Sequence, residues 1–283
     1  MSECHVSGVS RFLAIVAFIL LTACSKPVPP AVPVEKTYPV RGTVALVQPE
    51  RKTLRVAHEE IVGFMEAMTM EFDVATAAEI AALQPGDTIT GTLHVSETRS
   101  ELRGIVKTGH AVPPKPFVQA GAPKPGAGLP DATLLDDTGK SFRISGLRGK
   151  AVVLTFIYTR CPLPDYCPRM NNHFAAAIRD FPSERCAWLS ITIDPANDTP
   201  QALTAYARQF DPRPEQWKFV TGEPIEIAKV AAFSGLQLRK AGAQLDHNLQ
   251  TLVVDPEGKV TKVFTGNQWQ PGEIVAELKK ILP

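Results

Sequence analysis

Two proline-rich stretches divide this chain of 283 residues, and they constrain its fold more than any other feature. They lie at positions 27–39 and 113–130 and hold eleven of the 25 prolines. Because proline has no backbone N–H to donate and interrupts helices and strand ladders, both stretches are predicted to be linkers. The chain is therefore expected to fold as two blocks, with a tether at residues 24–37 and a linker at 111–128.

The charge balance excludes one broad class of partner. With 30 basic against 29 acidic residues, the chain has no excess charge that would hold nucleic acid or an anionic membrane surface. Apolar residues make up 44% of the sequence, which is enough for both blocks to have hydrophobic cores. We therefore expect partners at specific sites and predict no nucleic-acid binding.

The N-terminus resembles the export signal of a bacterial lipoprotein. The apolar run Phe12–Leu21 is too short to span a bilayer, which requires about 20 residues. It ends at positions 21–24 in Leu-Thr-Ala-Cys, which looks like a lipobox and implies that Cys24 is lipidated. We expect a signal peptide at residues 1–23 and a lipid-anchored protein on the periplasmic side of a bacterial membrane. The alternative is an uncleaved anchor or an ordinary signal peptide.

The first block, residues 38–110, is predicted to form a small all-β barrel of the Greek-key, OB-like kind. Alternating apolar residues indicate five short strands, with one helical piece between the third and the fourth. The strands are predicted at residues 38–46, 54–56, 69–74, 88–95 and 101–107, and the helix at 75–83.

Three of the chain's five methionines lie in this block, within a span of six residues. Met68 and Met70 share one face of a predicted strand, and a hairpin-like loop would bring His58 and Met65 over that face. Thioether sulfur is a soft donor that is never deprotonated, so such a cluster selects Cu(I) or Ag(I) over harder ions. The alternative is that the methionines only fill the barrel core.

The sequence Ala-Met-Thr-Met at positions 67–70 resembles a segment of the CusF-like periplasmic copper-binding barrels. The resemblance implies a copper site made of a histidine and two methionines, with a tryptophan stacked over the metal. This block has no tryptophan, and Met65 stands where that residue would be. We therefore expect copper on the histidine and both methionines, with Met65 as a further ligand or Phe64 as the ring that caps the site.

The second block, residues 129–283, is predicted to be an α/β domain in which strands alternate with helices. Its first long strand, at 151–157, is apolar throughout, as expected when both faces of a sheet are covered. Further strands are predicted at 187–193, 251–255 and 259–264, and helices at 172–181, 199–210, 224–234 and 271–282.

A cysteine pair follows the strand at 151–157. Cys161 and Cys167 lie where this strand meets the next helix, and the positive end of the helix dipole favours thiolates there. The prolines between them indicate a loop that lets both sulfurs converge. The alternative is a structural disulfide, because an exported protein lies in an oxidising compartment. His247 precedes the strand at 251–255 and is a third candidate, since loops at strand ends converge on one edge of such a sheet.

The whole second block resembles the SCO/SenC family of thioredoxin-like copper proteins. The resemblance rests on Cys161-Pro after the buried strand, on Ile-Asp-Pro at 193–195, on Asp-Thr-Pro at 198–200 and on His247. It implies a thioredoxin-like fold and copper, as Cu(I) or also as Cu(II), bound by both cysteines and this histidine. The usual family spacing has three residues between the cysteines, whereas this chain has five.

Three functions follow from these patterns. The SCO/SenC resemblance implies a membrane-tethered copper chaperone for the dinuclear copper centre of a cytochrome oxidase or for another periplasmic copper protein. The alternatives are a thiol-disulfide oxidoreductase that uses the cysteine pair, and a copper buffering or resistance protein in which the barrel is the main actor. The linker at 111–128 would let the barrel hand copper to the second site at a raised effective concentration.

Three other residues are expected to have structural roles. Cys186 opens a buried run and is expected to be a small core residue. Asp198 is expected to cap the helix that begins near Thr199. Asp246 would either orient the ring of His247 or be solvated.

Overall fold

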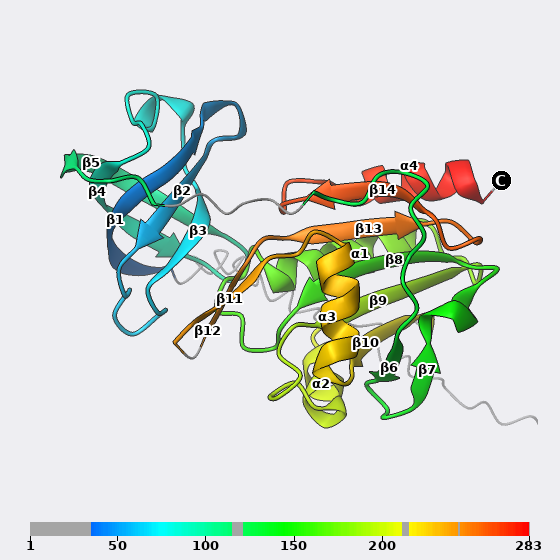
Figure 1. Cartoon of the computed structure of the whole chain (residues 1–283). Coiled ribbons are helices and arrows are strands. Elements are labelled where there is room, and N and C mark those ends of the chain that lie inside the picture. The colour runs from blue at the N-terminus through cyan, green and yellow to red at the C-terminus, as the bar shows by residue number, and fades with distance from the viewer. Residues whose placement is uncertain (1–34, 115–120, 211–214, 243, 283) are drawn as a thin grey trace, which may run out of the picture. The chain divides into compact units, whose positions relative to one another are not determined.

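The computed structural model describes residues 35–114, 121–210, 215–242 and 244–282 (Figure 1). The predicted signal peptide, the lipidation site Cys24 and most of the tether at 24–37 lie outside these residues, as does part of the linker at 111–128. All described residues fall in one compact unit. None of the helices in these ranges is both long and apolar enough to cross a membrane.

Five strands form the first sheet, in the order β3-β2-β1-β4-β5, and neighbouring strands are antiparallel (Figure 1). A parallel bridge between Val74 and Leu102 joins the two edges, so the sheet closes on itself. A closed five-stranded sheet of this kind is the small OB-like barrel that the sequence predicts. The strands are β1 (Lys36–Gln48), β2 (Thr53–His58), β3 (Met68–Asp73), β4 (Asp87–Val95) and β5 (Ser100–His110).

The helical piece predicted at residues 75–83 is shorter than expected. Only one 3-10 turn forms there, at Ala77–Glu79. Of the nine residues, Ile80 alone is fully buried, so a helix would have no continuous apolar face to pack against the barrel. Helices this short are marginal without such packing.

A seven-stranded mixed sheet forms the centre of the second block, in the order β14-β13-β8-β9-β10-β6-β7. The central strands β8 (Ala151–Ile157), β9 (Cys186–Thr192) and β10 (Trp217–Thr221) are parallel. Every residue of the first two is buried, as the continuous apolar runs predict. The outer strands are β6 (Thr133–Asp136), β7 (Ser141–Arg143), β13 (Gln250–Val254) and β14 (Val260–Thr265).

In the part of this block that the structure describes, four helices flank the sheet, and α1 packs against α4 (Figure 1). They are α1 (Cys167–Asp180), α2 (Pro200–Ala207), α3 (Pro224–Phe233) and α4 (Pro271–Ile281). Proline occupies the first or second position of each, where its missing N–H costs no hydrogen bond. The mixed sheet between helices is the thioredoxin-like fold expected for this block. Cys186 is fully buried in its core, as predicted.

A two-stranded hairpin, which the sequence did not predict, carries His247. Its strands are β11 (Leu238–Ala241) and β12 (Gln244–His247), and it is not part of the main sheet. The hairpin packs against β3, a strand of the barrel. This contact brings the histidine close to the segment that carries the methionines.

Candidate metal centre

Asp198 fixes the start of the loop that carries the cysteines through hydrogen bonds. This buried carboxylate accepts hydrogen bonds from the backbone and hydroxyl of Thr159, at 3.1 and 2.5 Å, and from the hydroxyl of Thr192 at 2.5 Å. The expectation that Asp198 caps α2 is therefore wrong. The helix is capped by Thr199, whose hydroxyl accepts from the amide of Ala202. Asp198 instead ties the end of β8 to the end of β9 and so positions the residues that precede Cys161.

The two sulfurs of the pair interact directly. The thiol of Cys167 donates a hydrogen bond to the sulfur of Cys161, and this bond lowers the pKa of Cys161. Cys167 begins α1 and is fully buried, and burial raises the pKa of its thiol well above the usual value. The sequence predicted lowered pKa values for both cysteines from the helix dipole, whereas in the structure the pKa is lowered at Cys161 only. Both are free thiols.

His247 lies at the end of β12 with its ring in a defined tautomer. Its Nδ1 is 2.8 Å from the carbonyl oxygen of Asn248, and because a carbonyl only accepts, Nδ1 carries the hydrogen. The lone pair is then on Nε2. Burial lowers the pKa of His247 to about 4, so the ring is neutral near pH 7. A neutral imidazole with a free Nε2 is the form that binds metals.

Asp246 does not hold the ring of His247. The ring is oriented by the Asn248 carbonyl, whereas Asp246 is buried and hydrogen-bonds with the backbone of Thr69 in β3. Burial raises the pKa of Asp246 to about 6. Its contact therefore joins the histidine hairpin to the strand that carries the methionines.

Cys161, His247 and Tyr158 line one small cavity. The rings of Tyr158 and His247 meet edge to face, with centroids 5.9 Å apart. Cys167 is fully buried and does not line the cavity. Within the described ranges, no three His, Cys, Asp or Glu side chains are close enough together to hold a metal ion.

In the barrel, strand register places His58 and two methionines on one face of the sheet. His58 of β2 lies opposite Met68 of β3, and Val56 lies opposite Met70. Because directly opposite residues and residues two apart share a face, His58, Met68 and Met70 lie on the same side of the sheet, as predicted. Met65 lies in the preceding loop and is buried, with its backbone paired to Ile61. All three methionines line the same cavity as Cys161 and His247.

His58 has the tautomer already described for His247. Its Nδ1 is 2.7 Å from the carbonyl oxygen of Glu59, and its Nε2 is buried without a hydrogen-bond partner. Burial lowers the pKa of this ring, which keeps it neutral. An unpartnered buried nitrogen is costly unless something binds it, and Cu(I) fits this donor among thioethers. Phe64 stacks on Tyr38, with ring centroids 4.5 Å apart.

Comparison with known proteins gives two family matches. The family model described as SCO1/SenC matches residues 126–283, and that of the copper binding periplasmic protein CusF matches residues 37–107. The SCO1 protein homolog of Bacillus subtilis is 27% identical over 154 residues, which are 52% of this chain and 79% of that protein. The SCO2-like protein of Rickettsia felis is 32% identical over 160 residues, 53% of this chain and 74% of that protein.

Among solved structures, a SCO1/SenC family lipoprotein from Bacillus anthracis is similar to this chain. It is 25% identical, the match covers 58% of this chain and 100% of that chain, and the TM-score is 0.52. These matches confirm both predicted resemblances. Copper is the metal named for the family that the barrel matches.

Proposed function

Because this chain belongs to the SCO1/SenC family, we propose that it is a copper chaperone, which binds Cu(I) through Cys161, Cys167 and His247 and passes it to a recipient protein. The observation that carries this proposal is the state of the three side chains. The pKa of the Cys161 thiol is lowered by Cys167, and the neutral imidazole of His247, with the lone pair on Nε2, lines the same cavity as Cys161. Two sulfurs and one imidazole suit Cu(I). Because Cys167 does not line the cavity, its side chain would have to move toward the cavity to bind the same ion.

We assign another copper site, the barrel site, to His58, Met65, Met68 and Met70. The shared face of these side chains and the unpartnered Nε2 of His58 support it. Thioethers remain ligands in an oxidising compartment, where thiols form disulfides. Copper is cargo at both sites.

The recipient that we propose is the dinuclear copper centre of a cytochrome oxidase. The support for it is the assembly role implied by the resemblance to the SCO/SenC family. We further propose that the chain is anchored by a lipid on Cys24 at the periplasmic side of a bacterial membrane. The lipobox-like sequence supports the anchor, and so does the similar Bacillus anthracis protein, which is a lipoprotein. A Cys24→Ser variant should then leave the membrane fraction, and unchanged membrane association would contradict the anchor.

Copper binding by the purified full chain tests the chaperone proposal. His247→Ala should lower the Cu(I) affinity of the site on Cys161, Cys167 and His247 and remove a nitrogen ligand from the X-ray absorption spectrum of copper. His110→Ala, on the last residue of β5, is the matched control and should leave both unchanged. If His247→Ala bound copper as tightly as the unchanged chain, with the same ligands, the assignment would be wrong.

Thiol-disulfide exchange is a second candidate, favoured by the lowered pKa of Cys161 beside a second thiol. His247→Ala separates the two functions, because disulfide reduction needs only the cysteines. If the variant loses copper and still reduces a test disulfide, the unchanged chain has both capabilities. A variant that loses reduction alone would favour the enzyme.

Deletion of the gene separates delivery from copper buffering. If the protein delivers copper, the deletion strain should lose cytochrome oxidase activity, and a Cys161→Ser copy should not restore it. Copper sensitivity with normal oxidase activity would instead indicate a buffering or resistance protein.

A further inference from the structure

The two sets of soft donors described above face the same cavity. Met65, Met68 and Met70 line it from the barrel, and Cys161 and His247 line it from the thioredoxin-like block. Its volume is about 20 Å³, which is room for about one water-sized occupant. A cavity of this size, lined by thioether, thiol and imidazole groups, matches one soft metal ion better than an organic ligand.

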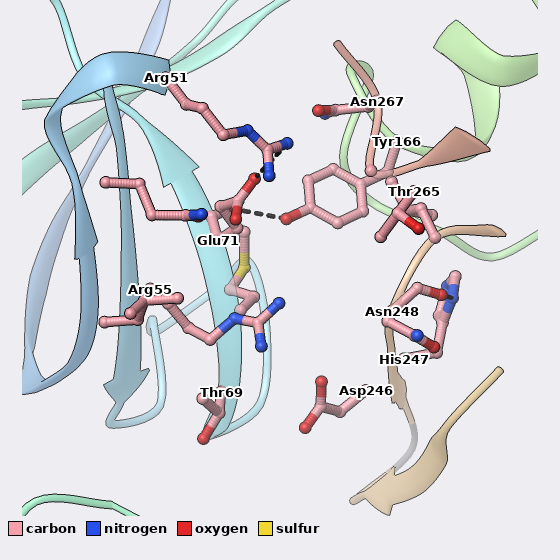
Figure 2. A pocket seen from close by; sticks show the side chains of 15 residues that line it. Arg51, Arg55, Thr69, Glu71, Tyr166, Asp246, His247, Asn248, Thr265 and Asn267 are labelled. Atoms are coloured by element: carbon pink, nitrogen blue, oxygen red, sulfur yellow. Dashed lines mark hydrogen bonds and ion pairs between the residues drawn. The ribbon is translucent and has the colours of Figure 1, made fainter. Parts of the chain in front are cut away.

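The loop between the two cysteines forms one side of this cavity. Leu163 and Tyr166 are buried in the apolar core of the barrel. The hydroxyl of Tyr166 donates a 2.6 Å hydrogen bond to the carbonyl of Glu71 in β3, as Figure 2 shows. The Ser100 hydroxyl of β5 donates a 2.7 Å bond to Asp165. The loop therefore binds the barrel through both apolar and polar contacts.

The hairpin that carries His247 forms the other side of the cavity. The Gln244 side chain donates to the carbonyl of Phe64 and accepts from the amide of Glu66, both at 3.3 Å. These two residues flank Met65. Asp246 bonds with the backbone of Thr69, which lies between Met68 and Met70. The contacts on both sides fix the methionines opposite the cysteine and the histidine.

We propose that the cavity is a transfer site, in which Met68 is a ligand to copper bound by Cys161 and His247. Met68 is the residue that connects the two sites, because it pairs with His58 in the barrel, is only half-buried and lines the shared cavity. The inference rests on the proposed copper function. It replaces a relay across a flexible linker by ligand exchange at a fixed contact.

The exchange needs no redox partner. Copper remains Cu(I) throughout, so no electron is transferred. The bonds from copper to His58, Met65 and Met70 break as bonds to the sulfur of Cys161 and to Nε2 of His247 form, and a proton held by the Cys161 thiol passes to water. Met68, bound throughout, would keep the ion from dissociating between the two sites.

Affinity in the full chain tests the role of Met68. In a chain that carries His58→Gln, Met65→Leu and Met70→Leu, the barrel site is disabled and only the site with Cys161 and His247 remains. Adding Met68→Leu should then weaken Cu(I) binding, measured by competition with a chromophoric Cu(I) chelator, by at least about tenfold, since groups that tune a metal site are worth about 10–100-fold. Met170→Leu in the same chain is the matched control, because Met170 is buried in the core of the thioredoxin-like block.

Selenomethionine labelling gives a second readout. In the chain without the other barrel ligands, the copper absorption spectrum should contain scattering from selenium as well as sulfur, and the selenium contribution should disappear with Met68→Leu. If Cys161→Ser leaves copper binding unchanged in this chain, the proposed function fails. If Cys161→Ser abolishes binding while Met68→Leu changes neither affinity nor scattering, only the transfer site is overturned.

A single substitution covers the case in which the multiple variant does not fold. Met68→Leu alone conserves volume and is expected to be tolerated. If Met68 is shared, titration with two equivalents of Cu(I) should show that this variant binds copper more weakly than the unchanged chain in both binding steps. Weakening of only one step would show two separate sites and would contradict the proposal.

Discussion

Ser100 donates a 2.7 Å hydrogen bond to the carboxylate of Asp165, so the last strand of the barrel holds the loop that separates the two cysteines. Asp165 is almost fully buried, and Asn267 donates a further 3.0 Å bond to its carbonyl. The loop has five residues, and it both positions the candidate ligands and binds the barrel. Stability of the docked arrangement and geometry at the cysteines are therefore expected to change together.

Leu163→Ala should destabilise the chain. The side chain is 4% exposed and packs in the barrel core, and truncation of such a leucine costs about 2–5 kcal/mol because a cavity remains. Urea unfolding followed by tryptophan fluorescence measures the loss. Ile225→Ala is the control, since Ile225 is 73% exposed, and it should change stability by less than about 0.5 kcal/mol. Equal effects of both substitutions would mean that the loop is not docked.

Cys161 should react with iodoacetamide before the other described cysteines do. It is partly accessible and its pKa is lowered, whereas Cys167 and Cys186 are fully buried and burial raises their pKa values. Reactivity follows the thiolate fraction and access. Mass spectrometry of the native metal-free protein after brief alkylation identifies the modified residue. Modification of Cys186 first would contradict the packing around β9.

Asp198→Asn should loosen the cysteine loop. The carboxylate accepts three hydrogen bonds from two threonines, and an amide presents hydrogens to one of these donors. We expect a loss of about 2–4 kcal/mol in stability, from the charged hydrogen bonds that are removed, together with weaker Cu(I) binding. Thermal unfolding and chelator competition measure the two effects. Asp180→Asn, at the exposed end of α1, should affect neither.

Asp136 should make stability depend on pH in acid. Burial alone would raise its pKa, but the Lys218 ammonium 2.6 Å away and hydrogen bonds from Thr138 and Lys140 lower it to about 2. The folded-state pKa is below the unfolded value of 3.8, so this stabilisation is present above about pH 4 and is lost as the pH falls toward 2.

Asp136→Asn should therefore cost about 1–2 kcal/mol at neutral pH and little at pH 2, after allowance for solvent screening. Urea unfolding of both proteins across this pH range measures the difference. A constant difference between pH 7 and pH 2 would contradict the ion pair between β6 and β10.

Local patterns were sufficient for the parts of the site that lie on regular strands. The alternation around Met68 and Met70 predicts their shared face, because side chains of a strand point alternately to its two sides. The continuous apolar run at 151–157 likewise predicts β8 with its observed bounds. In both cases the information lies within a few residues of the chain.

The docking of the cysteine loop was not predictable in the same way. Leu163 and Tyr166 are buried only because β3 and β5, some 60–100 positions earlier, cover them. The same holds for Asp198, whose hydrogen-bond donors lie on two other segments. The polar sequence of β11 and β12 has no clear alternation, so their hairpin also follows from tertiary packing.

The burial of Leu163, Tyr166 and Leu249 in the barrel core has a practical consequence for work on this protein. A shortened chain that begins after the linker would expose these side chains as an apolar surface patch, and such patches promote self-association. Solubility of the truncated protein would then depend on replacing them with polar residues. The thioredoxin-like block should therefore be produced alone only after the residues that contact the barrel have been redesigned.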